Sequence, residues 1–132
     1  AIFDDNLDEL ARIASETPDP ADAYISTLLA TVEMLARDRG FVDVFNHRDS
    51  ANAVKEDIAR RFLAILAQPL TAAQAAGRVR ADLKLEDAIL LVDMLGAAVG
   101  LTGPGRAENR TSRAVALVLD AIGPPDARRP LD

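Results

Sequence analysis

Residues 75–95 read AAGRVRADLKLEDAILLVDML, and this stretch decides the fold. It contains the end of one helical pattern, a turn at Gly77, and the start of a second, strongly apolar pattern. Glycine adopts a positive φ angle at little steric cost, so Gly77 is suited to end a helix as a left-handed cap. Arg78 or Arg80 can pair with Asp82 across the turn, as a surface salt bridge. The stretch therefore predicts a helix, a tight turn and a second helix.

The two last helical patterns, residues 85–99 and 111–122, are apolar nearly all the way round. At about 100° per residue each helix has two apolar faces, and a helix buries both inside a small domain only when it lies at the centre. We therefore expect part of this surface to meet a second subunit, with a central core helix as the alternative. Asp93 lies either at the margin of this interface or in a ligand pocket, and Leu117 falls on the opposite face of the last helix. The predicted homodimer interface consists of Leu90, Leu91, Met94, Ala98, Val115, Leu119 and Ile122.

Two helical patterns open the chain. Residues 2–16 carry an apolar stripe opposite an acidic face, which is typical of an amphipathic helix. The pattern stops at residues 17–20, TPDP, where two prolines prevent continuation. The aspartate of this segment can cap the next helix, with the following proline in the first helical position. That helix is predicted to extend to about Arg39, and Gly40 ends it.

The middle of the chain predicts one short and one long helix. Residues 41–48 favour a single short helix, and Asp49 or Ser50 can cap the long helix that follows. Pro69 lies inside this long pattern, where it removes a backbone donor and crowds the preceding turn, so we expect a kink or break near Gln68. The complete pattern predicts an all-α fold, an antiparallel bundle of about six helices.

Composition favours one globular domain over residues 1–132, with 49% hydrophobic and 27% charged residues. The chain has no cysteine, which excludes disulfides, thiolate metal sites and cysteine nucleophiles and favours a cytoplasmic location. A net charge of −6 repels phosphate backbones, so we do not expect this chain alone to bind DNA. Because Ala1 begins inside a helical pattern without a capping residue, we expect a truncated chain, and we expect residues 124–132 to form a frayed tail.

Catalytic and metal-binding patterns are missing from the sequence. His47 is the sole histidine, which excludes two-histidine zinc sites and di-iron bundles built on Glu-x-x-His pairs. The chain has no Gly-x-Ser-x-Gly, phosphate loop or Gly-x-Gly-x-x-Gly. We therefore expect no enzyme, no metal and no cofactor. His47 is either a surface or capping residue or a ligand contact.

The apolar stripe of residues 2–16 needs partners, and the available ones come from the next three helices. Small alanines between these helices and the kink at Pro69 favour an unfilled volume over a solid core, which is the competing outcome. We predict that this cavity binds a small, largely apolar molecule. Its predicted lining comprises Phe3, Leu7, Leu10, Tyr24, Leu28, Thr31, Leu35, Phe45, Asn52, Phe62 and Leu66. Tyr24, Thr31 and Asn52 would supply the polar contacts.

Three segments together resemble the TetR family of bacterial transcriptional regulators. AIFDDNLDELARIA, residues 1–14, is similar to the helix that leads from the helix-turn-helix domain into the ligand-binding domain. Residues 75–95 resemble the glycine and Arg-x-Asp turn before the first dimerisation helix, and SRAVALVLDAIGP, residues 112–124, resembles the last helix. The resemblance covers almost the whole chain in order and spacing. Two positions depart from the family pattern, Lys84 at a capping position and Ala121 where glycine is frequent.

The resemblance implies a ligand-sensing and dimerisation domain of a repressor. A small effector would bind inside the bundle, shift the helix of residues 2–16, and thereby control DNA binding by an N-terminal helix-turn-helix that this chain lacks. Residues 1–16 would then be the remnant of the linking helix, and operator DNA would be a partner only through the missing domain. The alternative function is a helical homodimeric interaction module without a small-molecule ligand.

Overall fold

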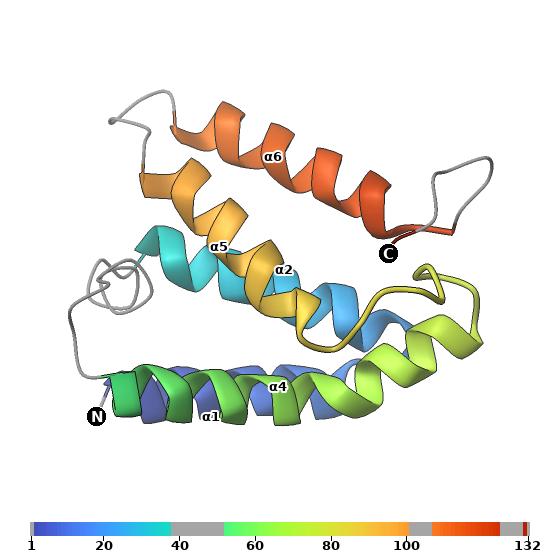
Figure 1. Cartoon of the computed structure of the whole chain (residues 1–132), viewed down its shortest axis with the longest axis horizontal. Coiled ribbons are helices and arrows are strands. Elements are labelled where there is room, and N and C mark those ends of the chain that lie inside the picture. The colour runs from blue at the N-terminus through green and yellow to red at the C-terminus, as the bar shows by residue number, and fades with distance from the viewer. Residues whose placement is uncertain (1, 38–51, 101–106, 125–130, 132) are drawn as a thin grey trace.

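The computed structural model describes residues 2–37, 52–100, 107–124 and 131 (Figure 1). Within these ranges the chain forms five α-helices and one 3-10 helix, and no strand. The elements are α1 (Ile2–Glu16), η1 (Pro20–Asp22), α2 (Ala23–Arg37), α4 (Asn52–Ala75), α5 (Asp87–Gly100) and α6 (Ala107–Ile122). The all-α prediction is confirmed, with five helices in the described part instead of about six. The short helix expected at 41–48 and the caps Asp49 and Ser50 lie outside the described residues.

The junction between the first two helices follows the predicted capping pattern. Asp19 has an extended backbone, and its carboxylate accepts a hydrogen bond of 3.0 Å from the backbone N–H of Ala21. Pro20 occupies the first helical position, where its missing N–H has no cost. The first turn is a separate 3-10 helix, so α2 begins at Ala23 and not at the cap itself.

Helix α4 is continuous through Pro69. Proline cannot donate a backbone hydrogen bond, and its ring pushes against the preceding turn, which bends a helix without necessarily ending it. In Figure 1 the C-terminal part of α4 turns away from the direction of its longer N-terminal part. The expected discontinuity near Gln68 is therefore a bend within one helix.

Gly77 ends α4 in the manner predicted from its position. Its φ is +73°, in the left-handed region. The N–H of Arg78 donates to the carbonyl of Ala73 at 2.9 Å, and the N–H of Gly77 donates to that of Gln74 at 3.1 Å. These two bonds form a Schellman motif, which satisfies carbonyls that the end of a helix leaves free.

The start of α5 explains why Lys84 is tolerated where a capping side chain is frequent. The carboxylate of Asp87 accepts a hydrogen bond of 2.8 Å from the backbone N–H of Lys84, three residues before it. This contact is one half of a capping box, in which a side chain inside the helix caps the residue that precedes it. The cap is thus supplied from within the helix.

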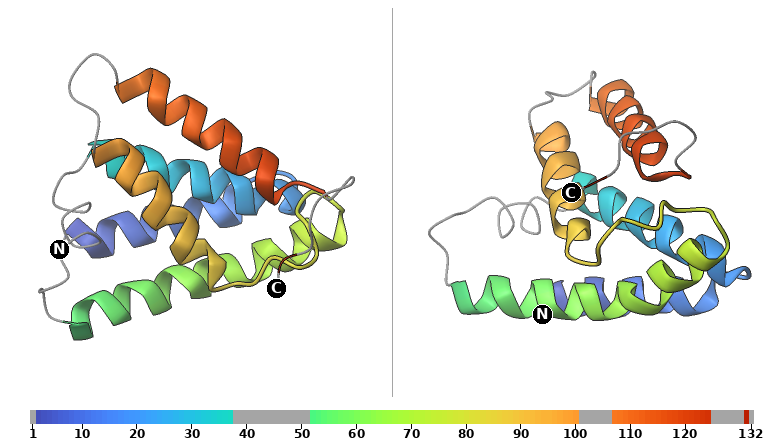
Figure 2. Two further views of the ribbon diagram at one scale, coloured as in Figure 1. Left: turned by 45° about the horizontal axis from the view of Figure 1, so that its top comes forward. Right: turned by 45° about the vertical axis from the view of Figure 1, so that its right-hand side comes forward.

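The helices form two layers joined by α2. Helices α1 and α4 run side by side in the same direction, and α2 packs on both of them (Figures 1 and 2). Helix α5 packs on α2, and α6 packs on the outside of α5 in the opposite direction. The buried core runs from α1 through α2 and α4 to α5, and Ile122 at the end of α6 joins it.

Candidate functional site

The predicted ligand lining maps onto the contact region of α1, α2 and α4. Its eight described side chains are all buried: Leu7, Leu10, Tyr24, Leu28, Thr31, Leu35, Phe62 and Leu66. Phe3 belongs to α1 and Asn52 begins α4, but their side chains are not among those described, and Phe45 lies outside the described residues, as does His47. The structure therefore brings the described residues into one buried region of the bundle.

Three buried polar atoms in this region have no hydrogen-bond partner within the described part of the chain. They are Asn6 Nδ2 on α1 and Tyr24 OH and Thr27 Oγ1 on α2. By contrast, the hydroxyl of Thr31 donates to the carbonyl of Thr27 at 2.8 Å. Burial raises the pKa of Tyr24 to about 12, and the negative charge of Asp87 adds to the effect, so the phenol stays protonated.

Sequence analysis did not select Asn6 or Thr27. The signal for Thr27 was present, because it lies three residues after Tyr24 and four before Thr31, on the same helical face. Asn6 was indistinguishable from the surrounding acidic residues of α1, since its burial depends on how α2 packs against α1.

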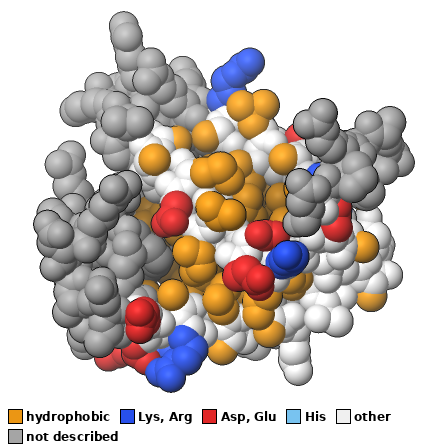
Figure 3. Space-filling view, viewed as in Figure 1, with side chains coloured by type: hydrophobic (Ala, Val, Ile, Leu, Met, Phe, Trp, Pro, Cys, Tyr) orange, Lys and Arg blue, Asp and Glu red, His pale blue; other side chains and the backbone are white. Residues whose placement is uncertain are grey.

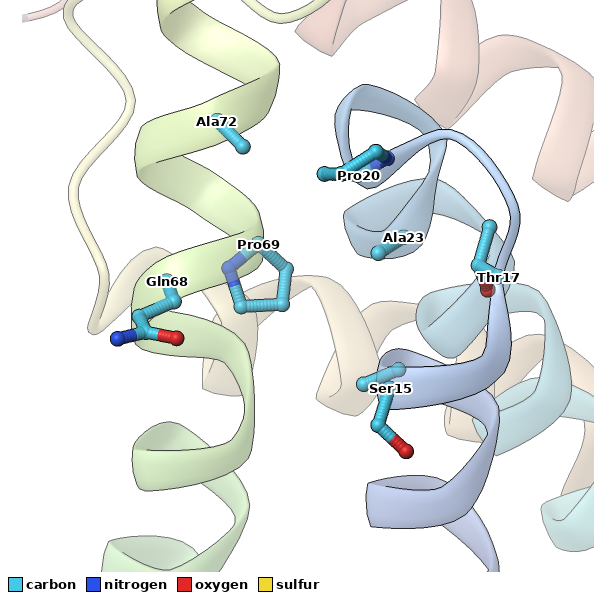
Figure 4. Close-up of a pocket in the computed structure, with 8 residues that line it drawn as sticks. Ser15, Thr17, Pro20, Ala23, Gln68, Pro69 and Ala72 are labelled. Atoms are coloured by element: carbon cyan, nitrogen blue, oxygen red, sulfur yellow. The ribbon is translucent and has the colours of Figure 1, made fainter.

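A pocket of about 240 Å³ lies beside Pro69, between α4 and the junction of α1 with α2 (Figure 4). Pro69 and Ala72 point across it toward Pro20 and Ala23. The lining consists of Ala14, Ser15, Thr17, Pro20, Ala23, Gln68, Pro69 and Ala72. None of these residues belongs to the predicted ligand lining, so this pocket is distinct from the buried region of Tyr24.

A second candidate site is the apolar surface of α5 and α6. Leu90 and Met94 on α5 are 60% and 53% exposed, and Leu117 on α6 is 63% exposed. Figure 3 shows hydrophobic side chains gathered on the face of the molecule where these helices lie. Asp93, also exposed, lies between Leu90 and Met94 in the sequence.

The other predicted interface residues differ in exposure. Ala98, Val115 and Leu119 are partly buried, whereas Leu91 and Ile122 are buried within the subunit. Leu117 is the most exposed large apolar residue among those described, although the sequence analysis placed it on the face opposite the interface. The open apolar surface of the single chain therefore includes Leu117 and does not include Leu91 or Ile122.

The turn after α4 ties α5 and α6 to the rest of the bundle. Arg80 binds both oxygens of Asp82, at 2.6 and 3.0 Å, and donates to the carbonyl of Ala121 at 3.3 Å. Its backbone N–H donates to the carbonyl of Ile122 at 2.8 Å. The Arg80 side chain is 7% exposed and that of Asp82 is 35% exposed, so this is a half-buried pair and not the surface salt bridge expected from the sequence. The pair fixes the C-terminal end of α6.

Arg78 does not take part in that pair. It binds Asp19 at 3.0 Å and also Asp22, and so joins the turn to η1. The hydrogen bond from Arg80, followed by one from the backbone N–H of Leu131, lowers the pKa of Asp82 to about 2. The carboxylate is therefore charged over the whole physiological pH range.

Metal-binding and membrane-spanning features were also sought in the described ranges. Those residues contain no group of three histidine, aspartate or glutamate side chains placed to hold a metal ion. None of the helices in the same ranges is long and apolar enough to cross a membrane.

The all-helical architecture agrees with that of the C-terminal domain of TetR-type transcriptional regulators. The family model of the SbtR-like C-terminal domain of transcriptional regulators matches residues 19–124. The chain belongs to this family, whose regulators act as dimers that bind DNA and small effectors. Neither curated proteins nor solved structures gave a match to the chain.

Proposed function

We propose that this chain is the effector-sensing and dimer-forming domain of a TetR-type repressor. The observation that carries the dimer is the exposure of Leu90, Met94 and Leu117 on two helices that pack against each other. Large apolar side chains gathered on one surface favour association, because contact with a second copy removes them from water. Related by a twofold axis, α5 and α6 of two copies form a four-helix interface.

In this proposal the effector is small and largely apolar and binds among the buried side chains of α1, α2 and α4. Leu10, Leu28 and Leu66 provide apolar contacts there, and Tyr24 provides a polar one. Binding shifts α1, which in the proposed full-length repressor connects to an N-terminal helix-turn-helix domain. The effector regulates DNA binding to the extent that it binds more tightly to one arrangement of α1 than to the other.

Sedimentation of the 132-residue chain at micromolar concentration tests the interface. We expect a dimer, and we expect Met94→Asp and Leu117→Asp to convert it to a folded monomer, because each places a charge in the apolar contact. Ala36→Asp, at an exposed position on α2, is the matched control and should leave the dimer intact. A monomeric wild-type chain, or dimers that tolerate both changes, would refute the proposed interface.

The alternative function is a homodimeric interaction module without a small ligand. Such a module would form the same dimer, but no ligand would bind in the buried region at α1 and α2. Thermal-shift measurements with small uncharged and charged organic compounds separate the two functions, because a ligand that binds the native state raises the melting temperature.

A further inference from the structure

The pocket beside Pro69 has walls from three parts of the chain. The end of α1 contributes Ala14, η1 contributes Pro20, and α4 contributes Pro69 and Ala72. In Figure 4 the two α4 side chains point across the pocket toward Pro20 and Ala23, the first residue of α2. A molecule bound in this pocket would therefore contact the end of α1, the start of α2 and the bent part of α4 at the same time.

The pocket is open because the side chains around it are short. Three of its eight lining residues are alanines and two are prolines, and none is a large aliphatic or aromatic residue. Since protein interiors are otherwise close-packed, a further group fits here without displacing a side chain. Ser15, Pro20 and Gln68 are exposed, so a ligand can reach the pocket from solvent without unfolding of the domain.

The volume of the pocket sets the size of the ligand. An apolar cavity of about 150 Å³ accommodates benzene, and pockets for drug-sized ligands begin at about 300 Å³. The pocket beside Pro69 has about 240 Å³ and lies between these two sizes. It therefore suits a molecule of one ring or two small fused rings.

Charge and hydrogen bonding restrict the ligand further. None of the lining residues is charged. The hydroxyl of Ser15 donates to the carbonyl of Arg12 at 3.0 Å, and the hydroxyl of Thr17 donates to the carbonyl of Ile13 at 2.6 Å, so neither hydrogen is available to an anion. The carboxylate of Glu16, between these two residues, is already bound to Arg12 at 2.5 Å. A charged ligand would therefore lose hydration and gain no counter-charge from the lining.

The two proline rings favour a flat, aromatic partner. Pro20 and Pro69 belong to opposite walls of the pocket. Proline rings pack well on aromatic rings, which is how proline-rich segments bind aromatic-lined grooves. Ala23 and Ala72 add methyl groups to the same two walls. The lining is thus complementary to an uncharged aromatic ring.

We propose that the pocket beside Pro69 is a second small-molecule site and that it binds an uncharged molecule built on one small aromatic ring system. The site is separate from the buried region at Tyr24, in which the proposed effector binds, and so it goes beyond the proposed function. Its occupant holds the end of α1 against α4, because it fills the space between them.

Indole is the probe for this site. The chain contains no tryptophan, so the fluorescence of indole reports the surroundings of the probe alone. Addition of the 132-residue chain to indole should shift the emission to shorter wavelength, because the ring leaves water for an apolar site. Indoleacetate and tryptamine carry the same ring with a negative and a positive charge, and both should bind more weakly than indole.

Substitutions that fill the pocket test its position. Ala72→Leu should weaken indole binding about tenfold or more, because the leucine side chain takes the place of the ring. The matched control is Ala64→Leu, the same change at an exposed position of α4, which should bind indole as the wild type does and should melt no higher than Ala72→Leu. Ala14→Leu fills the pocket from α1, with exposed Ala11→Leu as its control, and serves as the test if Ala72→Leu does not fold.

Three outcomes would overturn the proposal. They are no binding of indole at millimolar concentration, tighter binding of either charged analogue, and equal binding of indole by the wild type and the filled variants. The last outcome would place the ring outside this pocket. All three leave the sensing function standing, because that function depends on the buried region at Tyr24, so the failure of this site and the failure of the sensor are distinguishable.

Discussion

The side chain of Gln74 provides the sharpest test of how the turn is held. Its amide nitrogen lies 3.2 Å from the carbonyl oxygen of Arg80, 3.3 Å from that of Ala81 and 2.8 Å from that of Leu83. A single side chain of α4 therefore binds three backbone carbonyls of the segment that leads to α5. We predict that Gln74→Ala destabilises the domain more than the same substitution at Gln68, the other glutamine of this helix.

The magnitude follows from the number of hydrogens. The amide carries two N–H groups, so its three acceptors correspond to about two complete hydrogen bonds. At about 0.5–1.5 kcal/mol net for each bond, Gln74→Ala should lower the free energy of unfolding by about 1–3 kcal/mol. For a chain of this length that corresponds to a melting temperature lower by roughly 4–12 °C.

Urea unfolding at fixed protein concentration measures the effect, since dimer stability depends on concentration. The matched control is Gln68→Ala, six residues earlier in α4, where the side chain is exposed. Both substitutions replace glutamine by alanine in the same helix, so the difference between them reports chiefly the contacts of Gln74. If the two variants lose the same free energy within about 0.5 kcal/mol, the argument that Gln74 holds the turn is wrong.

Two further predictions concern the same turn. Gly77→Ala should lower the free energy of unfolding, measured in urea, by about 1–2 kcal/mol, because alanine is strained at a φ of +73°. No atom lies within 4 Å of the added methyl group, so this backbone strain is the whole effect. Gly77→Asn should lower the free energy of unfolding less. The carboxylate of Asp82 has its pKa lowered from 3.8 to about 2, so its stabilising contribution is complete above pH of about 4 and is lost as the pH falls through 2. Measured between those pH values, the unfolding free energy of Asp82→Asn should fall less steeply than that of the wild type, and parallel curves would contradict the assignment.

The helices and their ends could be read from the sequence because local rules decide them. Asp19 with Pro20 predicted the start of the second helical segment, and Gly77 predicted the end of α4, since each position depends on the backbone geometry of its immediate neighbours. Pro69 was harder, because a proline within a long helix can bend it or end it. In the structure α4 continues through Pro69 as one bent helix, and it packs against η1.

The candidate site was less accessible to such reasoning. Which face of an apolar helix stays open depends on the angle at which its neighbours pack, and periodicity does not contain that angle. Leu90 and Leu117 are open while Leu91 and Ile122 are buried, although all four are apolar residues of the same two helices. The sequence also left open which arginine pairs with Asp82, because Arg78 and Arg80 are just two residues apart. In the structure Arg78 pairs with Asp19 beside η1, whereas Arg80, next to the end of α6, pairs with Asp82.

The polar contacts of the turn join the α1–α2 junction to the C-terminal end of α6. Arg78 binds the η1 carboxylates beside the start of α2, and Gln74 holds the same turn to α4. From this turn Arg80 reaches the last carbonyls of α6, the helix that exposes Leu117. The position of α6 is therefore set by the end of α4 as well as by its packing on α5. We therefore expect a substitution that breaks these bonds at the end of α4 to loosen the C-terminal end of α6, the helix that carries part of the proposed dimer surface.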